Sequence, residues 1–323
     1  MAHTWRWANP PEWDRFAQHS PCATPFHARA WCETYCAYSP RYQARALALE
    51  LDTGRSVLLP LFLRSGVLRR GVFARAVSSR PGVYGGPIAL DGALRAEDWS
   101  AFARALPDLP LGAWECFGSA LDPLAPAAEH LHTGRRTTHV VDLGALPEDA
   151  LASYESNCRR NVRKAEREGV RVQREERAEA LREYYAMYVA SQRRWGEDPE
   201  RGYAERLFEL LAARAGAELW TARTSDGALA AGGWFLFSAA HVVYWHGAMH
   251  EEFSALRPAN ALHHTLIVEA RRRGARCYDF NPSEDLDGVK QFKRSFGARE
   301  LEFPTLRWRS AALARLERWL GRA

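Results

Sequence analysis

The sequence predicts a mixed α/β protein built from two copies of one unit. A chain of 323 residues is long enough for about two domains. Helical and strand patterns alternate along it, and each half repeats the same order: helices, a strand–turn–strand hairpin, then a crossover marked by glycine or proline. We therefore expect an N-terminal lobe at 1–145, a C-terminal lobe at 146–309 and a short amphipathic helix at 310–323.

The first lobe begins with two helical patterns, followed by a hairpin whose turn carries Asp52, Thr53 and Gly54. The segment after the hairpin, 78–87, has too much glycine and proline for a regular element. A helix and two short strands complete this lobe. We place these elements at 11–19, 28–38, 42–51, 56–63, 101–106, 113–117 and 139–143.

The second lobe is predicted to start with one long helix, 147–168, that ends at Gly169. A helix with Pro258 in its first turn and Gly274 just past its end has the usual helix punctuation. The other predicted elements of this lobe are strands and helices at 170–174, 178–195, 204–215, 217–222, 228–237, 241–248, 277–280 and 301–307.

The amino-acid composition limits where this protein is expected in the cell and which partners it is expected to bind. The longest apolar run, 57–63, is far shorter than the roughly 20 residues that span a bilayer, and the N-terminus has no apolar signal region. Six scattered cysteines without a C-x-x-C pair suit reduced, buried thiols. We expect a cytoplasmic protein, either free or at the inner membrane surface. Its net charge of +5 favours anionic partners.

Lysine is scarce in this chain, which makes each lysine informative. Of 44 basic residues only Lys164, Lys290 and Lys293 are lysines, and two of these lie within 288–297. Lysine is a compact charge with a tunable pKa, whereas arginine is a planar fork, so the two are not equivalent. A lysine retained in an arginine-rich chain is a candidate for a specific chemical task.

The segment 288–297 mixes cations and aromatic residues between two predicted strands. Phe292 and Phe296 are four apart and can anchor one face of a turn or short helix, which leaves Lys293 directed at a ligand. The alternative is a solvated basic turn held by two core phenylalanines. We expect Lys293 to be surface-accessible, so that its loss would change the melting temperature little.

A second basic cluster occupies the helix predicted near the junction of the lobes. Arg163 and Lys164 follow Arg160 by three and four residues, and Arg167 follows them by four and three, so these four cations share one helix face. Such a face can hold a diphosphate or a nucleic-acid backbone, although a plain solvated face has the same pattern. The chain has no phosphate-loop, dinucleotide-binding, nucleophile-elbow or H-E-x-x-H motif, and His246 and His250 suit packing better than metal binding.

Together these segments resemble the Fem peptidoglycan bridge-forming transferases. The segment 288–297 is similar to their G-x-x-x-F-K-x-x-F-G signature, and 156–169 to their basic S-K-x-x-R-x-x-x-R-K-A-x-x-x-G element, with Asn157 where lysine is often found. Further similar motifs follow in order at 79–81, 84–87, 257–261 and 278–281. The resemblance spans most of the chain, from about residue 24 to residue 303.

The resemblance implies two tandem GNAT-like (Gcn5-related acetyltransferase) lobes with a central cleft. It also implies transfer of an amino acid from aminoacyl-tRNA to an amine of a UDP-linked or lipid-linked peptidoglycan precursor. Phe292 and Lys293 would then support the transition state, since amine attack on an ester creates an oxyanion that a fixed cation stabilises. The implied substrate-binding residues are Arg80, Tyr84, Gly85, Gly86, Arg160, Arg163, Lys164, Arg257, Asn260, Asn281 and Lys290.

Two questions about the chemistry stay open at this stage. Asp279 is a candidate general base because it ends a strand that faces the expected cleft, and a structural acidic cap is the competing interpretation. Acyl-CoA is the alternative donor, but 253–260, where a CoA enzyme of this type needs a glycine-containing loop, has no glycine, and Pro258 lacks an N–H. We expect no metal and no bound cofactor.

Two further alternatives concern the whole protein and its C-terminus. A non-catalytic binding protein with the same fold is the alternative of another class. The amphipathic segment 310–320 is expected either to rest on a membrane that carries a lipid-linked precursor or to pack on the second lobe.

Overall fold

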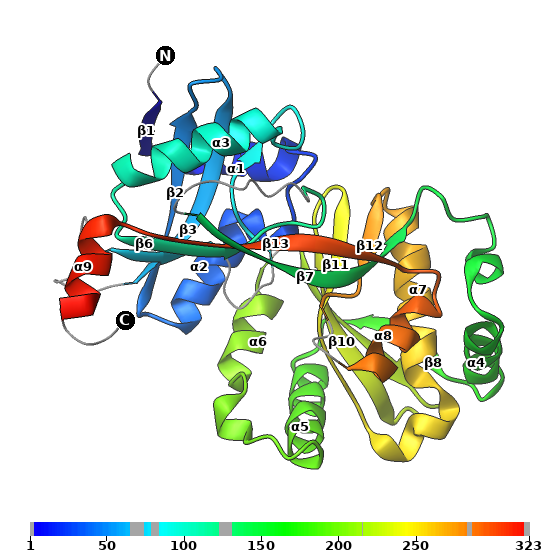
Figure 1. The fold of residues 1–323 in the computed structure, drawn as a ribbon. Helices are drawn as coiled ribbons and strands as arrows, with labels where there is room; N and C mark the ends of the chain where they lie inside the picture. The colour runs from blue at the N-terminus through cyan, green and yellow to red at the C-terminus, as the bar shows by residue number, and fades with distance from the viewer. Residues whose placement is uncertain are drawn as a thin grey trace. The chain divides into compact units, whose positions relative to one another are not determined.

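A computed structural model describes residues 3–64, 74–78, 84–122, 131–214, 216–282 and 286–319. The chain forms two compact units (Figure 1): unit 1 contains Met1–Thr137 and Glu302–Ala323, and unit 2 contains Thr138–Leu301. The chain leaves unit 1 within strand β7 (Leu131–Asp142) and returns to it within β13 (Arg299–Arg309). Unit 2 is therefore inserted into unit 1.

Unit 1 is a sheet with helices on both faces. The hairpin pairs Tyr42 with Arg64 at one end and Glu50 with Ser56 at the other, and Gly54 at φ 80° forms its turn. Alternate residues of the strands point to opposite faces. One face packs on helix α3 (Ala96–Ala105) through Phe102 of that helix and Trp114 of the sheet, whose ring centroids lie 5.5 Å apart.

The sheet of unit 1 has the strand order β1–β2–β3–β4–β6–β13, with β5 paired to β3. Its elements are β1 (Thr4–Trp7), α1 (Pro10–His19), α2 (Arg29–Tyr38), β2 (Tyr42–Glu50), β3 (Ser56–Arg64), β4 (Arg75–Val77), β5 (Ile88–Ala89), α3 (Ala96–Ala105), β6 (Ala113–Phe117) and α9 (Ala311–Trp319).

Unit 2 has the strand order β7–β12–β11–β10–β9–β8. Its strands β11 and β12 form a parallel pair over only three positions, from His241 opposite Cys277 to Val243 opposite Asp279. Its elements are α4 (Ser156–Arg167), β8 (Arg171–Glu175), α5 (Ala178–Arg194), α6 (Glu205–Ala212), β9 (Ala217–Arg223), β10 (Leu229–Phe237), β11 (His241–Met249), α7 (Pro258–Arg272), β12 (Cys277–Asp279) and α8 (Asp287–Arg294).

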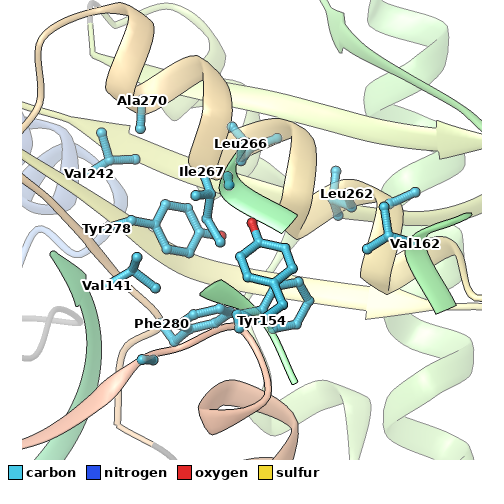
Figure 2. Close-up of a cluster of buried hydrophobic side chains, with 14 of the residues drawn as sticks. Val141, Tyr154, Val162, Val242, Leu262, Leu266, Ile267, Ala270, Tyr278 and Phe280 are labelled. Atoms are coloured by element: carbon cyan, nitrogen blue, oxygen red, sulfur yellow. The ribbon is translucent and has the colours of Figure 1, made fainter. Parts of the chain in front are cut away.

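The core of unit 2 lies where α4 and α7 pack on the sheet. Figure 2 shows Val162 of α4 and Leu262 of α7 meeting at one end of this cluster, with Tyr154 and Tyr278 near its centre. Tyr154 is 2% exposed and its hydroxyl lies 3.3 Å from Nδ1 of His264 on α7. Burial of these apolar side chains fixes α4 and α7 as one layer over the strands.

The elements depart from the expected ones in three places. The single helix expected at 147–168 is a short turn, Ala150–Ser153, followed by α4, because Tyr154 turns into the core and Glu155 is extended. The segment 288–297 is largely the helix α8, which ends before Gly297 at φ 77°. Strands β1, β4 and β5 were not predicted.

The C-terminal end of the chain also differs from expectation. Residues 302–309 and α9 belong to unit 1. The sequence instead predicted that 302–309 belong to the second lobe and that the C-terminal helix packs on that lobe or rests on a membrane. Leu313 of α9 is 4% exposed, so this helix has a buried side. Among the described residues, no helix is both long and apolar enough to cross a membrane.

Candidate active site

Lys293 lies on α8 and points into unit 2. The helix is anchored by Phe292 and Phe296, whose rings pack on each other at 5.2 Å and on His263 at 5.5 and 5.7 Å. Lys293 is 4% exposed, and its Nζ donates a hydrogen bond to the carbonyl oxygen of Asn281. The expectation of a surface-accessible lysine is therefore wrong: Lys293 lies on the side of α8 that packs into unit 2, whereas the next residue, Arg294, is exposed.

The position of Lys293 changes its chemistry. Burial lowers its pKa from 10.5 to about 8, and the negative charge of Asp279 offsets part of this effect. The ammonium is still the main form at pH 7, but it is held in a medium of low dielectric with one protein acceptor named above. A cation in this state interacts more strongly with a developing negative charge than a solvated one does.

Asn281 is the residue that fixes Lys293. It adopts a left-handed conformation (φ 65°), which is uncommon for a residue other than glycine. Its N–H donates to Oδ1 of Asp279 at 2.8 Å, and its Nδ2 donates to the carbonyl of Trp245 at 3.4 Å. It therefore bridges the point where β11 and β12 diverge. Its Oδ1 is buried and, within the described part of the chain, accepts no hydrogen bond.

Asp279 is fully enclosed at the end of β12. Its Oδ1 accepts a hydrogen bond from Thr138 at 2.7 Å in addition to the one from Asn281, and its Oδ2 lies 3.3 Å from Nε2 of His241. Burial opposes a charge on His241, but Cys277 and Asp279 outweigh it and raise its pKa to about 10. This geometry matches the structural interpretation, in which Asp279 caps the turn at Asn281.

Sequence reasoning missed His139, a titratable group near Lys293. It is 1% exposed, and its carbonyl accepts the N–H of Phe280 at 2.9 Å, so β7 places it beside the end of β12. Its Nε2 lies 3.4 Å from Oε2 of Glu300. Burial and the charge of Lys293 lower its pKa. The pairing of β7 with β12 is tertiary, so no local signal in the sequence identifies His139.

The N-terminus of α7 offers few backbone donors to a phosphate. Pro258 has no N–H, and the N–H of Arg257 donates to Ser254 at 3.1 Å. The N–H groups of Asn260 and Ala261 donate to the carbonyl of Arg257 at 3.1 and 3.3 Å. Arg257 itself is exposed and left-handed (φ 61°). A pyrophosphate-binding loop needs several free N–H groups, which this turn uses internally.

Helix α4 carries its cations on the side that faces solvent. Cys158, Val162 and Ala165 form its buried side, while Arg160 and Arg163 are exposed and Lys164 is half-buried. None of these three cations takes part in an ion pair with the residues that the structure describes. The end of α8 adjoins this helix, because the N–H of Glu155 donates to the carbonyl of Ser295 at 2.9 Å.

Of the other predicted binding residues, Asn260 and Tyr84 are buried in packing contacts and Lys290 is half-buried. Asn260 is 6% exposed and its Nδ2 lies 3.7 Å from Sγ of Cys158, so it joins α7 to α4 and does not face solvent. Lys290 is half-buried on α8. In unit 1, Tyr84 is fully buried against Phe26 and Phe303, which makes it a core residue and corrects its expected contact with substrate.

The backbone geometry of unit 1 requires glycine at positions 85 and 86. A Cβ on Gly85 would lie 2.3 Å from the carbonyl oxygen of Ser78, and Gly86 has φ 97°. Both therefore shape a tight turn, whether or not a ligand approaches it. Arg80 falls outside the described residues. Among those that are described, no group of three or more His, Cys, Asp or Glu side chains is arranged to hold a metal.

The geometry of unit 2 agrees with the comparisons to known proteins. Residues 152–294, which lie within unit 2, match the family model described as an acetyltransferase (GNAT) domain. This part of the chain is therefore similar to acetyltransferase (GNAT) domains. Among curated proteins, none matches the sequence.

The whole fold has counterparts among solved structures. It is similar to FemX at 17% identity and a TM-score of 0.67, over 93% of this chain and 96% of that one. It is also similar to a tandem GNAT protein from the clavulanic acid biosynthesis pathway, at 13% identity and a TM-score of 0.51, over 94% of this chain and 97% of that one. A third similar structure is the C-terminal domain of a putative lysylphosphatidylglycerol synthetase from Agrobacterium fabrum. Its identity is 11% and its TM-score 0.51, over 86% of this chain and 88% of that one. These matches show the fold, and they confirm the mixed α/β, tandem GNAT prediction.

Proposed function

We propose that this GNAT protein transfers an amino acid from aminoacyl-tRNA to an amine of a peptidoglycan precursor or a similar acceptor. The observation that carries the proposal is the buried ammonium of Lys293, held by Asn281 with its pKa lowered to about 8. Attack of an amine on an ester places negative charge on the carbonyl oxygen, and a fixed cation beside that oxygen stabilises it.

The reaction can be written as an ordinary aminolysis. The amine nitrogen bonds to the ester carbonyl carbon, and the carbonyl electrons move to the oxygen, which Lys293 stabilises. The nitrogen loses a proton, the C–O bond to the ribose breaks, and the ribose oxygen takes up a proton. Asp279, with Thr138, Asn281 and His241 around its carboxylate, serves in this scheme to position Asn281 and thereby Lys293.

The proton from the amine needs an acceptor other than Asp279. Among the described groups around Lys293, His139 has the property required, since burial and the nearby ammonium lower its pKa and keep the imidazole neutral at pH 7. We assign it as the proton acceptor in this scheme. Glu300, 3.4 Å from Nε2, is placed to stabilise the imidazolium that results.

Two features of unit 2 support a tRNA donor. The turn before α7 uses its N–H groups internally, which leaves little for the pyrophosphate of CoA. Arg160 and Arg163 on α4 are exposed cations without ion pairs in the described part of the chain, as expected for side chains that contact a polyanion.

The test is transfer of a radiolabelled amino acid from charged tRNA to UDP-linked or lipid-linked muropeptide, with Lys293→Met as the control. We expect transfer with at least one common aminoacyl-tRNA and a loss of roughly 10² to 10³ in rate in the variant. Absence of transfer with all common aminoacyl-tRNAs and both acceptors would refute the tRNA proposal.

A second candidate is favoured by the match of 152–294 to an acetyltransferase domain: an acyl-CoA-dependent N-acyltransferase acting on a small amine or polysaccharide precursor. Thermal stabilisation by CoA, without stabilisation by UDP-muropeptide, would select it. A non-catalytic binding protein is the third possibility. If Lys293→Met binds ligand normally, and cells that carry this variant have an unchanged cell wall, the protein is a non-catalytic binding protein.

A further inference from the structure

His139 is a buried imidazole whose two ring nitrogens both lack a hydrogen-bond partner among the residues that the structure describes. Only 1% of the residue is exposed. A neutral imidazole has one N–H donor and one acceptor, and leaving such groups unpaired in the interior costs free energy of folding. An unpaired buried group of this kind needs an explanation in the structure around it.

The carboxylate of Glu300, at the start of β13, lies close to this imidazole. Its Oε2 is 3.4 Å from Nε2 of His139. The same oxygen accepts a hydrogen bond from the guanidinium of Arg294 at 2.6 Å. The bond from Arg294 is short and charge-assisted, whereas 3.4 Å exceeds the usual length of a hydrogen bond between nitrogen and oxygen. Arg294 therefore occupies the oxygen that His139 would otherwise use.

The three side chains come from three elements of unit 2. Arg294 is the last residue of α8, Glu300 follows on β13, and His139 lies on β7, which neighbours β13 in the sheet. The side chains of Arg294 and Glu300 are 48% and 38% exposed, so the ion pair reaches the surface while the imidazole is enclosed. The carboxylate on the adjacent β12, that of Asp279, is directed at His241 instead.

The charged groups that shift the pKa of His139 lie on α8 and β13. Burial lowers this pKa most, and Lys293, Arg294 and Lys290 lower it further, whereas Glu300 raises it. Arg294 acts in two ways. Its own charge disfavours the imidazolium, and its hydrogen bond engages the carboxylate oxygen that would favour it.

We propose that Arg294 is a positioning residue that keeps His139 available as a proton acceptor by binding the carboxylate oxygen of Glu300. This inference rests on the proposed function, in which His139 takes the proton of the attacking amine. While Arg294 holds Oε2, the imidazole stays neutral and can accept that proton. Once the imidazolium forms, its charge attracts the same carboxylate, 3.4 Å from Nε2.

The test is a titration of His139 by NMR in the full chain, without substrate. The chain has 11 histidines, and the Hε1–Cε1 resonance of His139 is assigned by its absence in His139→Gln. Arg294→Gln removes the cation and releases Glu300, so the pKa of His139 is expected to rise by about 0.5 to 1 unit, the modest size reflecting the exposure of the ion pair. Glu300→Gln removes the carboxylate, so the pKa is expected to fall below the wild-type value.

Two control variants separate the pairing from a plain loss of charge. Arg294→Lys keeps a cation that can donate to Glu300 and is expected to restore most of the wild-type pKa of His139. Arg299→Gln removes a cation from the residue next to Glu300. Since Arg299 is 70% exposed and pairs with Asp142 at 3.3 Å, the pKa of His139 is expected to stay unchanged in this variant.

The same shift is expected in the pH profile of the transfer reaction. Catalysis requires neutral His139, so kcat/KM falls as the pH drops through its pKa, and this acid limb should lie at a higher pH in Arg294→Gln. The alkaline limb, set by Lys293, should stay near pH 8. A purely structural role for Arg294 would lower the rate at every pH and leave the acid limb in place.

The outcomes are distinct. Equal titration of His139 in wild type and Arg294→Gln, or a lower pKa in the variant, would overturn the inference. An equal rise in Arg299→Gln would also overturn it, because the effect would then come from net charge alone. The titration needs no substrate, so it decides the role of Arg294 even if no transfer from charged tRNA is observed.

Discussion

Replacement of Lys293 by methionine is expected to stabilise the protein while it removes catalysis. Methionine has nearly the same length but carries no charge that must be buried. The pKa of Lys293 is about 8 in the folded chain and 10.5 in an unfolded one, so the unfolded state binds more protons between these values. Burial of the charged lysine therefore costs stability at pH 7, and this cost fades as the pH rises.

The size of the effect follows from the two pKa values. A shift from 10.5 to about 8 corresponds to about 3 kcal/mol at pH 7. By linkage, wild type should gain about 2.5 kcal/mol relative to Lys293→Met between pH 7 and pH 10. At pH 7 the variant is expected to be more stable by about 1 to 3 kcal/mol, since it also loses the hydrogen bond to Asn281.

The assay is urea unfolding of both proteins at pH 7, 8, 9 and 10, analysed as the difference in the free energy of unfolding at each pH. Lysine scarcity provides an independent readout: with Lys164, Lys290 and Lys293 as the only lysines, ¹³C-methylated chains give few resonances. One should titrate near pH 8 and vanish in Lys293→Met. A stability difference that does not change with pH, or no resonance near pH 8, would refute the assignment of a buried ammonium.

Three further outcomes are expected. The kcat/KM of the transfer reaction should fall as the pH rises through about 8, because Lys293 loses the proton that stabilises the oxyanion; a plateau up to pH 10 would contradict this role. The double variant Arg160→Gln/Arg163→Gln should weaken tRNA binding and reduce the slope of log K against log salt by about 1.5 to 2, as measured by filter binding; an unchanged slope would remove α4 from the interface. Asp98→Asn should cost about 1 to 3 kcal/mol in urea unfolding, because it removes one of the two carboxylates that pair with the buried guanidinium of Arg55. Asp98 lies 2.7 Å from this group, and Asp91, at 2.8 Å, remains. Although burial opposes its charge, hydrogen bonds from Arg55 and other donors lower the pKa of Asp98 to about 2, so wild type should lose this stabilisation as the pH falls from about 3.8 through 2; equal acid sensitivity of wild type and variant would contradict it.

Local patterns were sufficient for most elements of the fold. Polarity alternation and the turn at Asp52–Gly54 predicted the first hairpin, which pairs from Tyr42 with Arg64 to Glu50 with Ser56. Pro258 and Gly274 marked the two ends of α7 to within a residue. The break between the turn Ala150–Ser153 and α4 was not predictable locally, since it depends on the core that receives Tyr154.

The sequence by itself determined which residue to examine. The scarcity of lysine and the pair Phe292 and Phe296 singled out Lys293, because residue type and helical spacing are written in the chain. Only the tertiary structure decided its state. Asp279 and His139 lie on β12 and β7, two strands whose pairing joins distant segments, and Asn281 follows β12. The burial that results lowers the pKa of the ammonium. Burial depends on long-range contacts that exclude solvent. For this reason Lys293, which the sequence predicted to be exposed, is enclosed in the folded protein.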